Sequence, residues 1–394
     1  FINMLKVALG QSKMLSKPIS GVLHLIVYIG FIIINIELLE IILDGLLGTH
    51  RLFAPYLGSF YNFLIGSFEI LAAFVIFSVI FFWTRRNLIK IRRFWSPEMT
   101  GWPKRDADII LFFEIILMSL FLSMNSTDLL LQNLESPNYL KAGSFPVSQF
   151  LTPFFNSFTH ETLIIFERTF WWLHITGILI FLNYLYYSKH LHILLAFPNT
   201  FFANLDPKGK FNNNKLVYRE VKHILEPNSD PYLTNENNPD QSKFGVSDVL
   251  DLNWIQLMNS YSCTECGRCT AECPANQTGK LLSPRKIMMD TRDRLEEVGR
   301  NISLNGSFKD DGNELLDNYV TKEEIWACTS CNACVEACPI GIDPLSIIME
   351  MRQYLVLEES SAPSDLNNMM NNIENNGAPW PFNNQDRLLW AEDN

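Results

Sequence analysis

Basic residues are in the minority in this chain. It has 31 Lys and Arg against 42 Asp and Glu among 394 residues, so its formal net charge is −11, and its sequence pI is about 5.2. Proteins that bind nucleic acid usually carry blocks or patches of positive charge. The composition therefore argues against nucleic acid as a partner.

The chain also lacks the usual signatures of a substrate site. It has no glycine-rich loop after a strand pattern, no nucleophile with a base beside it and no Cys-Cys pair. It shows no signal peptide with a cleavage site. Its first residue is Phe, so we expect a further N-terminal piece, with another span among the candidates. No visible site remains at which the chain itself would transform a small molecule.

Charged residues are scarce in the first half. Four segments of roughly 18–25 mostly apolar residues are each long enough to cross about 30 Å of hydrocarbon as a helix. They are about 19–43, 60–83, 107–124 and 164–187. Buried helices of a soluble protein are the alternative, which their number, length and charged flanks disfavour. We expect a transmembrane helix bundle at 1–200.

Basic residues flank these segments unequally. One side carries Lys6, Lys13, Lys17, Arg85, Arg86, Lys90, Arg92, Arg93, Lys104, Arg105 and Lys189, whereas the other carries Arg51, Lys141 and Arg168. The positive-inside rule makes the first side cytoplasmic, so the half that follows the last span is cytoplasmic too. On the outer side, the runs SQFLTPFFNSF and HETLIIF within 126–163 look amphipathic, and we expect them along the membrane surface.

All eight cysteines lie in two runs, CTECGRCTAECPA and CTSCNACVEACPI, and both fit C-x2-C-x2-C-x3-C-P. In bacterial ferredoxins the fourth cysteine of each such run binds the other cluster. This spacing predicts two [4Fe–4S] clusters. The ligands of the first are Cys263, Cys266, Cys269 and Cys338, and those of the second are Cys328, Cys331, Cys334 and Cys273.

Disulfides and zinc sites are weaker interpretations of these runs. Disulfides need an oxidising compartment, and zinc sites take C-x2-C pairs rather than two runs of four. The 54 residues between the runs, 274–327, contain helical patterns such as SPRKIMMDTRDRLEEVG. We therefore expect an all-α protein with a linker at 201–250, an α-helical dicluster ferredoxin domain at 251–357 and a polar tail at 358–394 for partner docking.

The last predicted span carries three of the seven histidines. In WWLHITGILIFLNYLYYSKHLHI, residues 171–193, His174 lies near one end and His190 and His192 near the other. On one continuous helix His174 and His192 share a face, about 27 Å apart along the axis, and His190 points to the opposite side. Ionisable groups are expensive in lipid, so the segment is a candidate functional site.

A fourth histidine offers a ligand pair. His24, in the first turns of the first span, lies on the cytoplasmic side at a depth similar to that of His192. Two histidines at matched depth on neighbouring helices predict bis-histidine binding of a haem b. The alternative is that terminal histidines sit at the headgroups and bind nothing, which we prefer for His190.

A second haem would need a partner for His174 near the outer surface. His50 and His160 are candidates on that side, both expected in loops, and a quinone site is the alternative role for His174. Four carboxylates also lie within the predicted spans, namely Glu37, Glu40, Glu69 and Glu114. Membrane carboxylates are candidates for proton or quinone chemistry. The alternative is that groups on packed neighbouring helices bond these carboxylates.

The membrane pattern resembles the cytochrome b subunits of respiratory nitrate reductase and heterodisulfide reductase. The resemblance rests on WWLHITGILIFLNYLYYSKHLHILLAFPNTFF, with His174, the SKHLH run and the exit at 198–202, and on GVLHLIVYIGF, with His24. That family usually has a second histidine on the first of these spans, where this chain has Ile34. The resemblance implies one haem b, bound by His24 and His192. A second haem would lack the histidine that the family has at the position of Ile34.

The soluble pattern resembles heterodisulfide-reductase-like iron–sulfur oxidoreductases. NWIQLMNSYSCTECGRCTAECPANQTGKLLSPRKI is similar to their dicluster module, and APWPFNNQDRLLWAEDN is similar to the linker into Cys-Cys-Gly catalytic domains of fused relatives. The resemblance implies the N-terminal half of an electron-transfer flavoprotein:menaquinone oxidoreductase. It also implies a separate Cys-Cys-Gly-domain iron–sulfur subunit, electron-transfer flavoprotein and menaquinone or another quinone as partners.

We therefore expect an electron-transfer subunit of a respiratory quinone oxidoreductase complex in the bacterial inner membrane. Electrons would pass between a cytoplasmic redox partner, the clusters, the haem and quinone. Three alternatives remain, which are a subunit of a complex that reduces a disulfide-like substrate, a module of a lactate or glycerol-3-phosphate dehydrogenase, and a non-redox anchor. An anchor would have no use for eight ordered cluster ligands.

Overall fold

The computed structural model describes residues 1–207, 209–210, 214–226, 243–382, 386 and 388–392. Within these residues the chain is mostly helical and no strand is present, so the expected all-α fold is confirmed. The chain forms two compact units, one of Phe1–Phe202 with Tyr261–Gly267 and one of Ala203–Ser260 with Arg268–Asn394. Much of the linker predicted at 201–250 lies outside the described residues.

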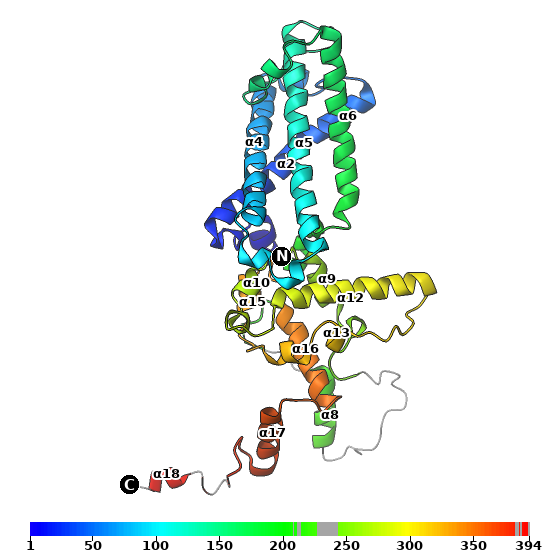
Figure 1. The fold of residues 1–394 in the computed structure, drawn as a ribbon. Helices are drawn as coiled ribbons and strands as arrows, with labels where there is room; N and C mark the ends of the chain where they lie inside the picture. Colours follow the sequence, from blue (N-terminus) through cyan, green and yellow to red (C-terminus); the bar gives the residue numbers. More distant parts are fainter. Residues whose placement is uncertain (208, 211–213, 227–242, 383–385, 387, 393–394) are drawn as a thin grey trace. The chain divides into compact units, whose positions relative to one another are not determined.

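The first unit contains four helices that are long and apolar enough to cross a membrane (Figure 1). They are α2 (Pro18–Leu47), α4 (Ser59–Asn87), α5 (Trp102–Asn133) and α6 (His160–Leu185). The short α3 (Ala54–Leu57) joins the first two. Gly48, in the left-handed region at φ +68°, caps the C-terminus of α2, where a residue with a side chain would be strained.

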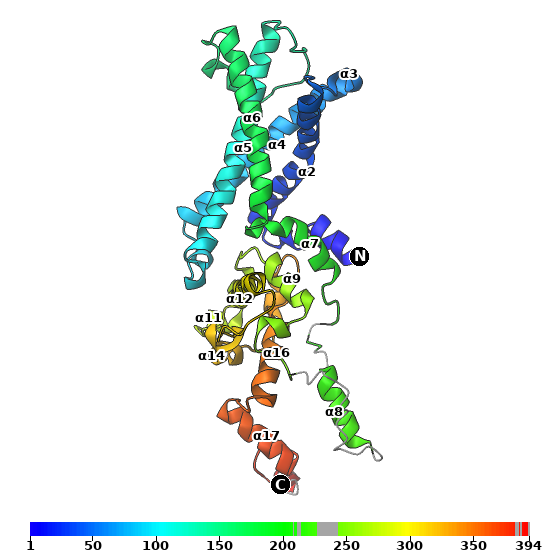
Figure 2. The ribbon, with the colours of Figure 1, turned by 90° about the vertical axis from the view of Figure 1, so that its right-hand side faces the viewer.

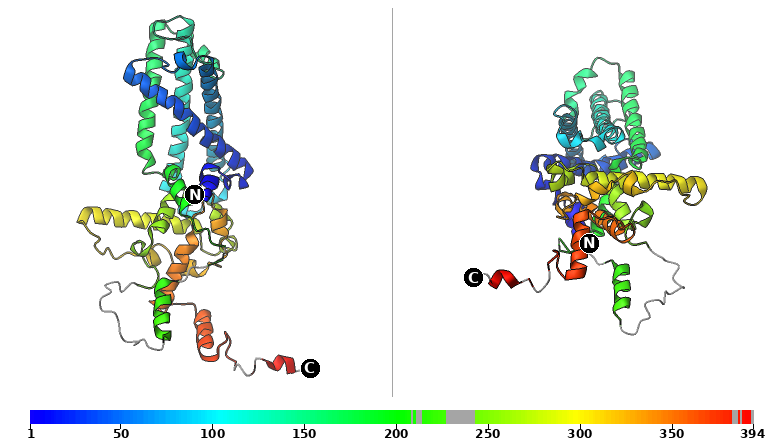
Figure 3. Two further views of the ribbon diagram at one scale, coloured as in Figure 1. Left: turned by 180° about the vertical axis from the view of Figure 1, so that it is seen from behind. Right: turned by 60° about the horizontal axis from the view of Figure 1, so that its bottom comes forward.

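Helix α5 packs along α6, and α4 packs against both α2 and α5. Figure 3 shows α2 crossing the upright helices obliquely. Glycines allow close approach at two of these contacts. A Cβ on Gly30 of α2 would lie 2.7 Å from Val75 of α4, and one on Gly177 of α6 would lie 2.7 Å from Leu117 of α5. Small residues at such positions let membrane helices pack tightly.

The last spanning helix ends before His190 and His192. Helix α6 ends at Leu185, Ser188 is extended, and its Oγ accepts a hydrogen bond of 3.1 Å from the His190 N–H. This serine caps a new turn, η7 (Lys189–Leu191), which leads into α7 (His192–Phe201). Serine competes for backbone hydrogen bonds in this way and favours helix starts. The prediction of one continuous helix from His174 to His192 is therefore wrong.

The connection between α5 and α6 also differs from expectation. SQFLTPFFNSF forms two short 3₁₀ turns, η5 (Ser148–Phe150) and η6 (Thr152–Phe154), whereas HETLIIF is the first part of α6 itself. Thr159 accepts from the Thr162 N–H and caps α6. The expectation for HETLIIF is therefore wrong, because this run continues into the spanning helix. The place of SQFLTPFFNSF along the membrane surface stays a prediction.

The N-terminal segment, α1 (Ile2–Met4) and the π-helical η1 (Leu5–Leu9), packs against α7. Asn3 Nδ2 donates to the Thr200 carbonyl at 2.6 Å, and Figure 2 shows α7 beside the N-terminus.

The second half of the chain contains shorter helices. They are α8 (Lys215–Leu225), α9 (Trp254–Ser262), α10 (Arg268–Ala271), α11 (Pro274–Gln277), α12 (Pro284–Asn305), α13 (Leu315–Asn318), α14 (Lys322–Trp326), α15 (Ala333–Ala337), α16 (Pro344–Leu357), α17 (Ser364–Asn376) and α18 (Leu389–Glu392). In the second unit α12 packs on α16, and α10 packs on α15. Gly245, at φ +82°, lets its loop pass so close to α16 that a Cβ would lie 2.4 Å from the Glu350 carbonyl.

A buried arginine ties two loops of the second unit to α12. The Arg294 side chain is fully buried and bonds Asp248 at 3.0 and 2.9 Å and Asp311 at 2.7 and 3.0 Å. These hydrogen bonds lower the pKa of Asp311 below its usual value. Charge-assisted bidentate pairs are the strong hydrogen bonds, so Arg294 orders the unit around the second half of α12.

Replacing Arg294 with methionine should destabilise the second unit, because it leaves two carboxylates without their cation. Removing one partner of a buried pair costs about 3 kcal/mol or more. We expect a lower thermal midpoint by circular dichroism, with Arg300→Met, exposed on the same helix, as the control. Since the Asp311 pKa is depressed, the pair stabilises above the unfolded carboxylate pKa, and this contribution is lost as pH falls through the folded pKa. The thermal midpoint of R294M should therefore fall less than that of the wild type as the pH is lowered through this range. Equal thermal midpoints for R294M and R300M would contradict this role of Arg294.

Candidate iron–sulfur and haem-binding sites

The two cysteine runs adopt the same backbone conformation. The third and fifth residues of the first run, Glu265 and Gly267, have φ values of +57° and +70°. Ser330 and Asn332, at the same positions of the second run, have φ values of +55° and +60°. Positive φ is uncommon for residues with a side chain, so this match is not a default of the chain. The runs therefore form one loop type twice.

A short helix follows each loop, α10 after the first and α15 after the second, and the two pack together. The fourth cysteine of each run is extended, Cys273 at φ −76°, ψ +118° and Cys338 at φ −74°, ψ +126°. Each precedes a proline, which disfavours helical backbone at the residue before it. The proline thus stops the chain from continuing as helix at the last ligand position.

The thiols of the second unit show which cysteines are neighbours. Cys334 has its pKa raised to about 12, mainly by burial and then by Asp343, Cys328 and Cys273. Burial also raises the pKa of Cys328, with Cys273 and Cys331 adding to the effect. Cys273, from the first run, thus lies within electrostatic reach of two cysteines of the second run. Crossed ligation requires this proximity. Cys331 is exposed, and its assignment as a ligand stays a prediction.

The donor set fits iron–sulfur clusters. Thiolates are the ligands of such clusters, and metal binding removes the proton that burial otherwise favours. Four thiolates surround a cubane, so they need not converge on one ion. Accordingly, within the described part of the chain, no three His, Cys, Asp or Glu side chains are placed to hold a single ion.

A residue that the sequence analysis missed, Arg352 of α16, holds the second cysteine loop. Its Nε and Nη2 donate to the Ile325 carbonyl at 3.1 and 2.8 Å, its Nη2 donates to the Cys328 carbonyl, and its guanidinium lies 5.0 Å from the Trp326 ring. The Ser330 N–H donates to Cys328 Sγ at 3.4 Å. Hydrogen bonds to sulfur and nearby charge set cluster potentials. No local sequence pattern marks Arg352, because it follows the second run on a separate helix.

The first cysteine loop belongs to the unit of the membrane helices. Tyr261–Gly267 groups with Phe1–Phe202, and within this unit the Lys189 ammonium pairs with the Glu265 carboxylate. Lys189 Nζ also donates to the Pro103 carbonyl at 2.6 Å. Both side chains of the ion pair are largely buried, so this contact is screened little by solvent. It joins the segment that carries Cys263 and Cys266 to the turn that carries His190.

Three predicted histidines lie together at this end of the unit. The His190 ring is 5.5 Å from the His192 ring and 5.3 Å from that of Phe181. Burial, with smaller contributions from His192 and His24, lowers the pKa of His190 to about 3. The expectation that His190 points away from His192 is wrong, because the break at Ser188 resets the helical phase. His190 thus lies beside the candidate haem ligand His192.

Two imidazoles have the orientation expected of ligands. His192 Nδ1 lies 3.0 Å from the Lys189 carbonyl, and burial lowers its pKa. His174, 2% exposed, has Nδ1 3.0 Å from the Leu117 carbonyl and its ring 5.9 Å from Phe121. A Nδ1–H bond to a carbonyl fixes the neutral tautomer with Nε2 available to a metal. His192 therefore fits haem binding by donor type and tautomer, and His24 fits it by donor type and by its location near His190.

The outer candidates for pairing with His174 have other contacts. His50 Nε2 lies 3.2 Å from Asp128, and its ring is 4.8 Å from that of Tyr139. His160 Nε2 lies 2.8 Å from Ser136 Oγ. His174 itself contacts α5, so these contacts do not join His50 or His160 to it.

Crossed ligation predicts an unusual grouping of cysteine variants. Cys273→Ser should change the same cluster signal as Cys328→Ser, because both thiols serve the second cluster. Cys338→Ser should instead change the signal that Cys263→Ser changes. Electron paramagnetic resonance of the reduced full chain distinguishes the two signals, and a grouping of variants by run would contradict the assignment.

Replacing Arg352 with glutamine should lower the reduction potential of the cluster bound by Cys328. A cation beside a cluster favours its more negative, reduced form, so losing the charge favours oxidation. The measurement is a potentiometric titration followed by electron paramagnetic resonance. Arg352→Lys should keep most of the potential, and the exposed Arg300→Gln is the control. Unchanged potentials in R352Q would contradict this role.

Comparison with known proteins agrees with these features. A family model described as a 4Fe-4S dicluster domain matches residues 262–342. The chain is 28% identical over 413 aligned positions to the probable iron-sulfur-binding oxidoreductase FadF of Bacillus subtilis, with 98% of this chain and 54% of FadF covered. It is 26% identical to EtfAB:quinone oxidoreductase of Syntrophomonas wolfei, with 97% of this chain and 52% of that protein covered.

A shorter match supports the heterodisulfide-reductase resemblance. The chain is 31% identical to one subunit of the ferredoxin/F420H2-dependent CoB-CoM heterodisulfide reductase of Methanosarcina acetivorans, over 29% of this chain and 58% of that subunit. No solved structure matches the chain. The chain spans about half the length of FadF and of EtfAB:quinone oxidoreductase. It is therefore a membrane-associated iron–sulfur protein with a 4Fe–4S dicluster domain, related along almost its whole length to these two oxidoreductases.

Proposed function

We propose that this chain is the membrane electron-transfer subunit of a quinone oxidoreductase complex, of the electron-transfer flavoprotein:menaquinone oxidoreductase type. The observation that carries the proposal is the composition of the first unit. It combines half-buried histidines at the end of four apolar helices with the segment that carries Cys263 and Cys266. A haem-binding end and a cluster-binding loop in one compact unit suit the transfer of electrons into or out of a membrane.

The cofactors follow from the ligands. The eight cysteines hold two [4Fe–4S] clusters, and His24 and His192 hold a haem b. When bound, these groups supply one-electron transfer between a two-electron donor and a quinone. The chain's own residues set their environment. The Lys189 carbonyl orients the His192 imidazole, and the Ser330 N–H and Arg352 stabilise negative charge at Cys328.

The charge distribution supports an orientation in the bacterial inner membrane. The basic residues that flank the ends of α4 and α5, such as Arg85, Arg86 and Lys104, place this side in the cytoplasm by the positive-inside rule. The dicluster domain follows α6 and α7 on the same side. A donor in the cytoplasm thus reaches the clusters, and quinone reaches the membrane helices.

The polar C-terminal tail is the proposed docking segment for a catalytic iron–sulfur subunit. Helix α17 leaves Met370 36% and Ile373 47% exposed, and Trp380 after it is 45% exposed. Apolar side chains exposed together suit an interface. A Cys-Cys-Gly-type iron–sulfur subunit is the proposed partner of this segment.

Reconstitution of the native complex in lipid tests the function. Reduced electron-transfer flavoprotein should reduce a menaquinone analogue in the presence of the complex, and Cys334→Ser should abolish this activity by removing a cluster ligand. His24→Ala and His192→Ala should each lose the bis-histidine haem spectrum and quinone reduction, whereas His223→Ala of α8 should keep both.

Full haem content in both His24→Ala and His192→Ala would contradict the ligand assignment. Co-purification with a lactate or glycerol-3-phosphate dehydrogenase, and no reaction with electron-transfer flavoprotein, would replace the proposed donor. Reduction of a disulfide-like substrate by the complex would favour the heterodisulfide-reductase alternative.

A further inference from the structure

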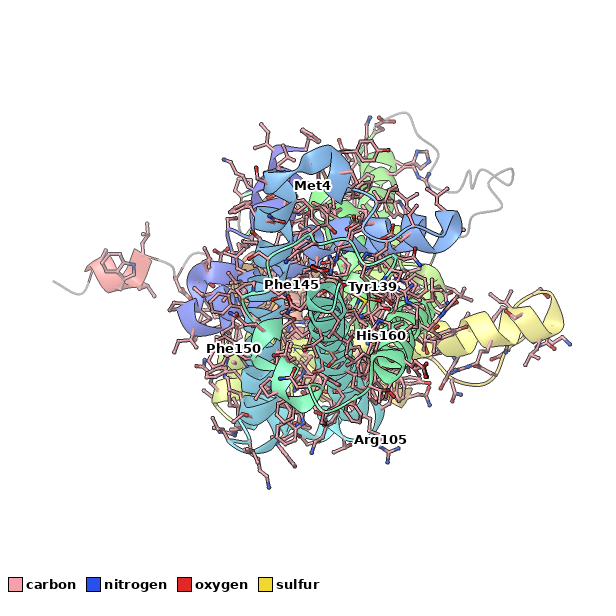
Figure 4. The ribbon with its side chains drawn as sticks, turned by 90° about the horizontal axis from the view of Figure 1, so that it is seen from above. Met4, Arg105, Tyr139, Phe145, Phe150 and His160 are labelled. Atoms are coloured by element: carbon pink, nitrogen blue, oxygen red, sulfur yellow. The ribbon has the colours of Figure 1, made fainter. Side chains whose placement is uncertain are left out.

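The other end of the first unit holds a group of buried and half-buried charged side chains that the proposed electron transfer does not use. We name it the carboxylate cluster. Its carboxylates are Glu37, Glu40 and Asp44 of α2, Glu69 of α4, Asp128 of α5 and Glu167 of α6. Its basic members are His50 and Arg51, which follow α2, and Arg168 of α6. Figure 4 views this end and labels Tyr139 and Phe145, which contact Glu167 and Arg51.

Arg51 is the central cation of the carboxylate cluster. Its guanidinium bonds Asp128 at 2.6 Å, Asn125 at 3.0 Å and Tyr61 at 3.1 Å, and it lies 5.1 Å from the Phe145 ring. Asp128 also accepts from Gln132 at 3.2 Å. Arg51 is 6% exposed, so this ion pair is desolvated and strongly coupled. Its charge is therefore balanced by Asp128.

Glu40 and Asp44 of the cluster are stabilised by donated hydrogen bonds. Glu40 accepts from the Phe53 N–H at 2.8 Å and from the Tyr61 hydroxyl at 2.7 Å. Asp44 accepts from the N–H groups of Arg51 and Leu52 at 2.8 and 3.1 Å and from Thr49 Oγ1 at 2.6 Å. Hydrogen bonds donated to a carboxylate favour its charged form.

The carboxylates of Glu69 and Glu167 are satisfied in the same way. Glu69 accepts from the N–H groups of Val147 and Ser148 at 2.9 and 3.0 Å and from Asn125. Glu167 pairs with Arg168, whose Nη2 lies at 2.7 Å, and accepts from Tyr139 at 3.0 Å. Each of these two carboxylates therefore has hydrogen-bond partners within the protein.

Glu37 is the exception in the carboxylate cluster. Its side chain is 3% exposed, and its Oε2 has no hydrogen-bond partner among the described residues. Arg51 is shared with Asp128, while Glu40 and Glu69 add negative charge around Glu37. A buried charge without its own partner is expensive, so such a group binds a proton instead. The geometry therefore favours Glu37 as a neutral carboxylic acid.

Glu37 lines a cavity of about 30 Å³, which His50, Arg51 and Glu167 also line. One water needs roughly 10–15 Å³ by this measure, so about two waters fit. A quinone ring does not fit, because sites for such molecules have at least about 300 Å³. His50 Nδ1, on the same wall, also has no hydrogen-bond partner among the described residues. The cavity therefore suits water that bonds Glu37 and His50.

We propose that Glu37 is a proton-exchange site that gives its proton to cavity water and takes it back. In the forward step the Glu37 O–H bond breaks, a water oxygen forms the new O–H bond, and the products are a carboxylate and hydronium. Arg51 stabilises the carboxylate in that state. The use of this proton in quinone reduction rests on the proposed function. Quinone reduction consumes two electrons, which the clusters and haem supply, and two protons, of which Glu37 delivers one.

Infrared spectroscopy of the full chain in lipid nanodiscs tests the site directly. The wild type should show the C=O stretching band of a protonated carboxylic acid that shifts in deuterated water. Glu37→Gln should lose this band, Glu37→Asp should restore a shifted one, and Glu161→Gln, exposed at the start of α6, should keep it. Absence of the band in the wild type, or its persistence in E37Q, would overturn the assignment.

A kinetic measurement separates the failure of this site from the failure of the proposed function. In the reconstituted complex E37Q should slow quinone reduction by roughly 100-fold, the lower range for loss of a proton-transfer group, while haem reduction by the donor stays unchanged. Quinone reduction in E37Q at the wild-type rate would overturn the role of Glu37. No quinone reduction by the wild type would overturn the proposed function, while the infrared band would still establish the exchangeable proton.

Discussion

The architecture of the membrane unit depends on one constraint, which is that hydrocarbon offers no partner for a polar group. Every ionisable side chain inside the bundle must therefore be bonded by the protein or be neutral. The constraint also organises the connections. The carboxylates of Asp44 and Glu40 accept hydrogen bonds from the backbone of the turn after α2, and that of Glu69 accepts one from the backbone just before η5. Arg51 forms an ion pair with Asp128 of α5. The carboxylates thus fold the connecting segments over the ends of the helices.

The two ends of the unit differ chemically. His24 lies near the start of α2 and Glu37 thirteen residues later, which is about 20 Å along a helix. The histidine end is close to the cysteine loop and suits electron transfer. The carboxylate end contains a small polar cavity and suits proton exchange. One helix therefore carries both kinds of group and keeps them apart.

Local patterns predicted much of this protein, and long-range contacts account for what they missed. The cluster motifs are local, because each run carries four cysteines in a short stretch of sequence and a proline follows it. Helix length and composition likewise revealed the four apolar helices. Hydropathy did not reveal the break at Ser188, because the residues around it remain apolar while one hydroxyl redirects the backbone. The partners of the carboxylates could not be predicted, since residues far apart in sequence, such as Arg51 and Asp128, form them.

The repeated conformation of the cysteine loops has a consequence for how such proteins diverge. Each loop makes its own turns, and the helix after it packs on its counterpart. The segment between the runs supports the loops at both of its ends, where Ser283 contacts Thr270 and the Ile325 carbonyl binds Arg352. Its middle, with α12 and the Arg294 contacts, is stabilised by ion pairs of its own. Substitutions of exposed residues there, such as Arg300 and Asn305, can therefore change the surface of the domain while the buried contacts of both loops stay in place.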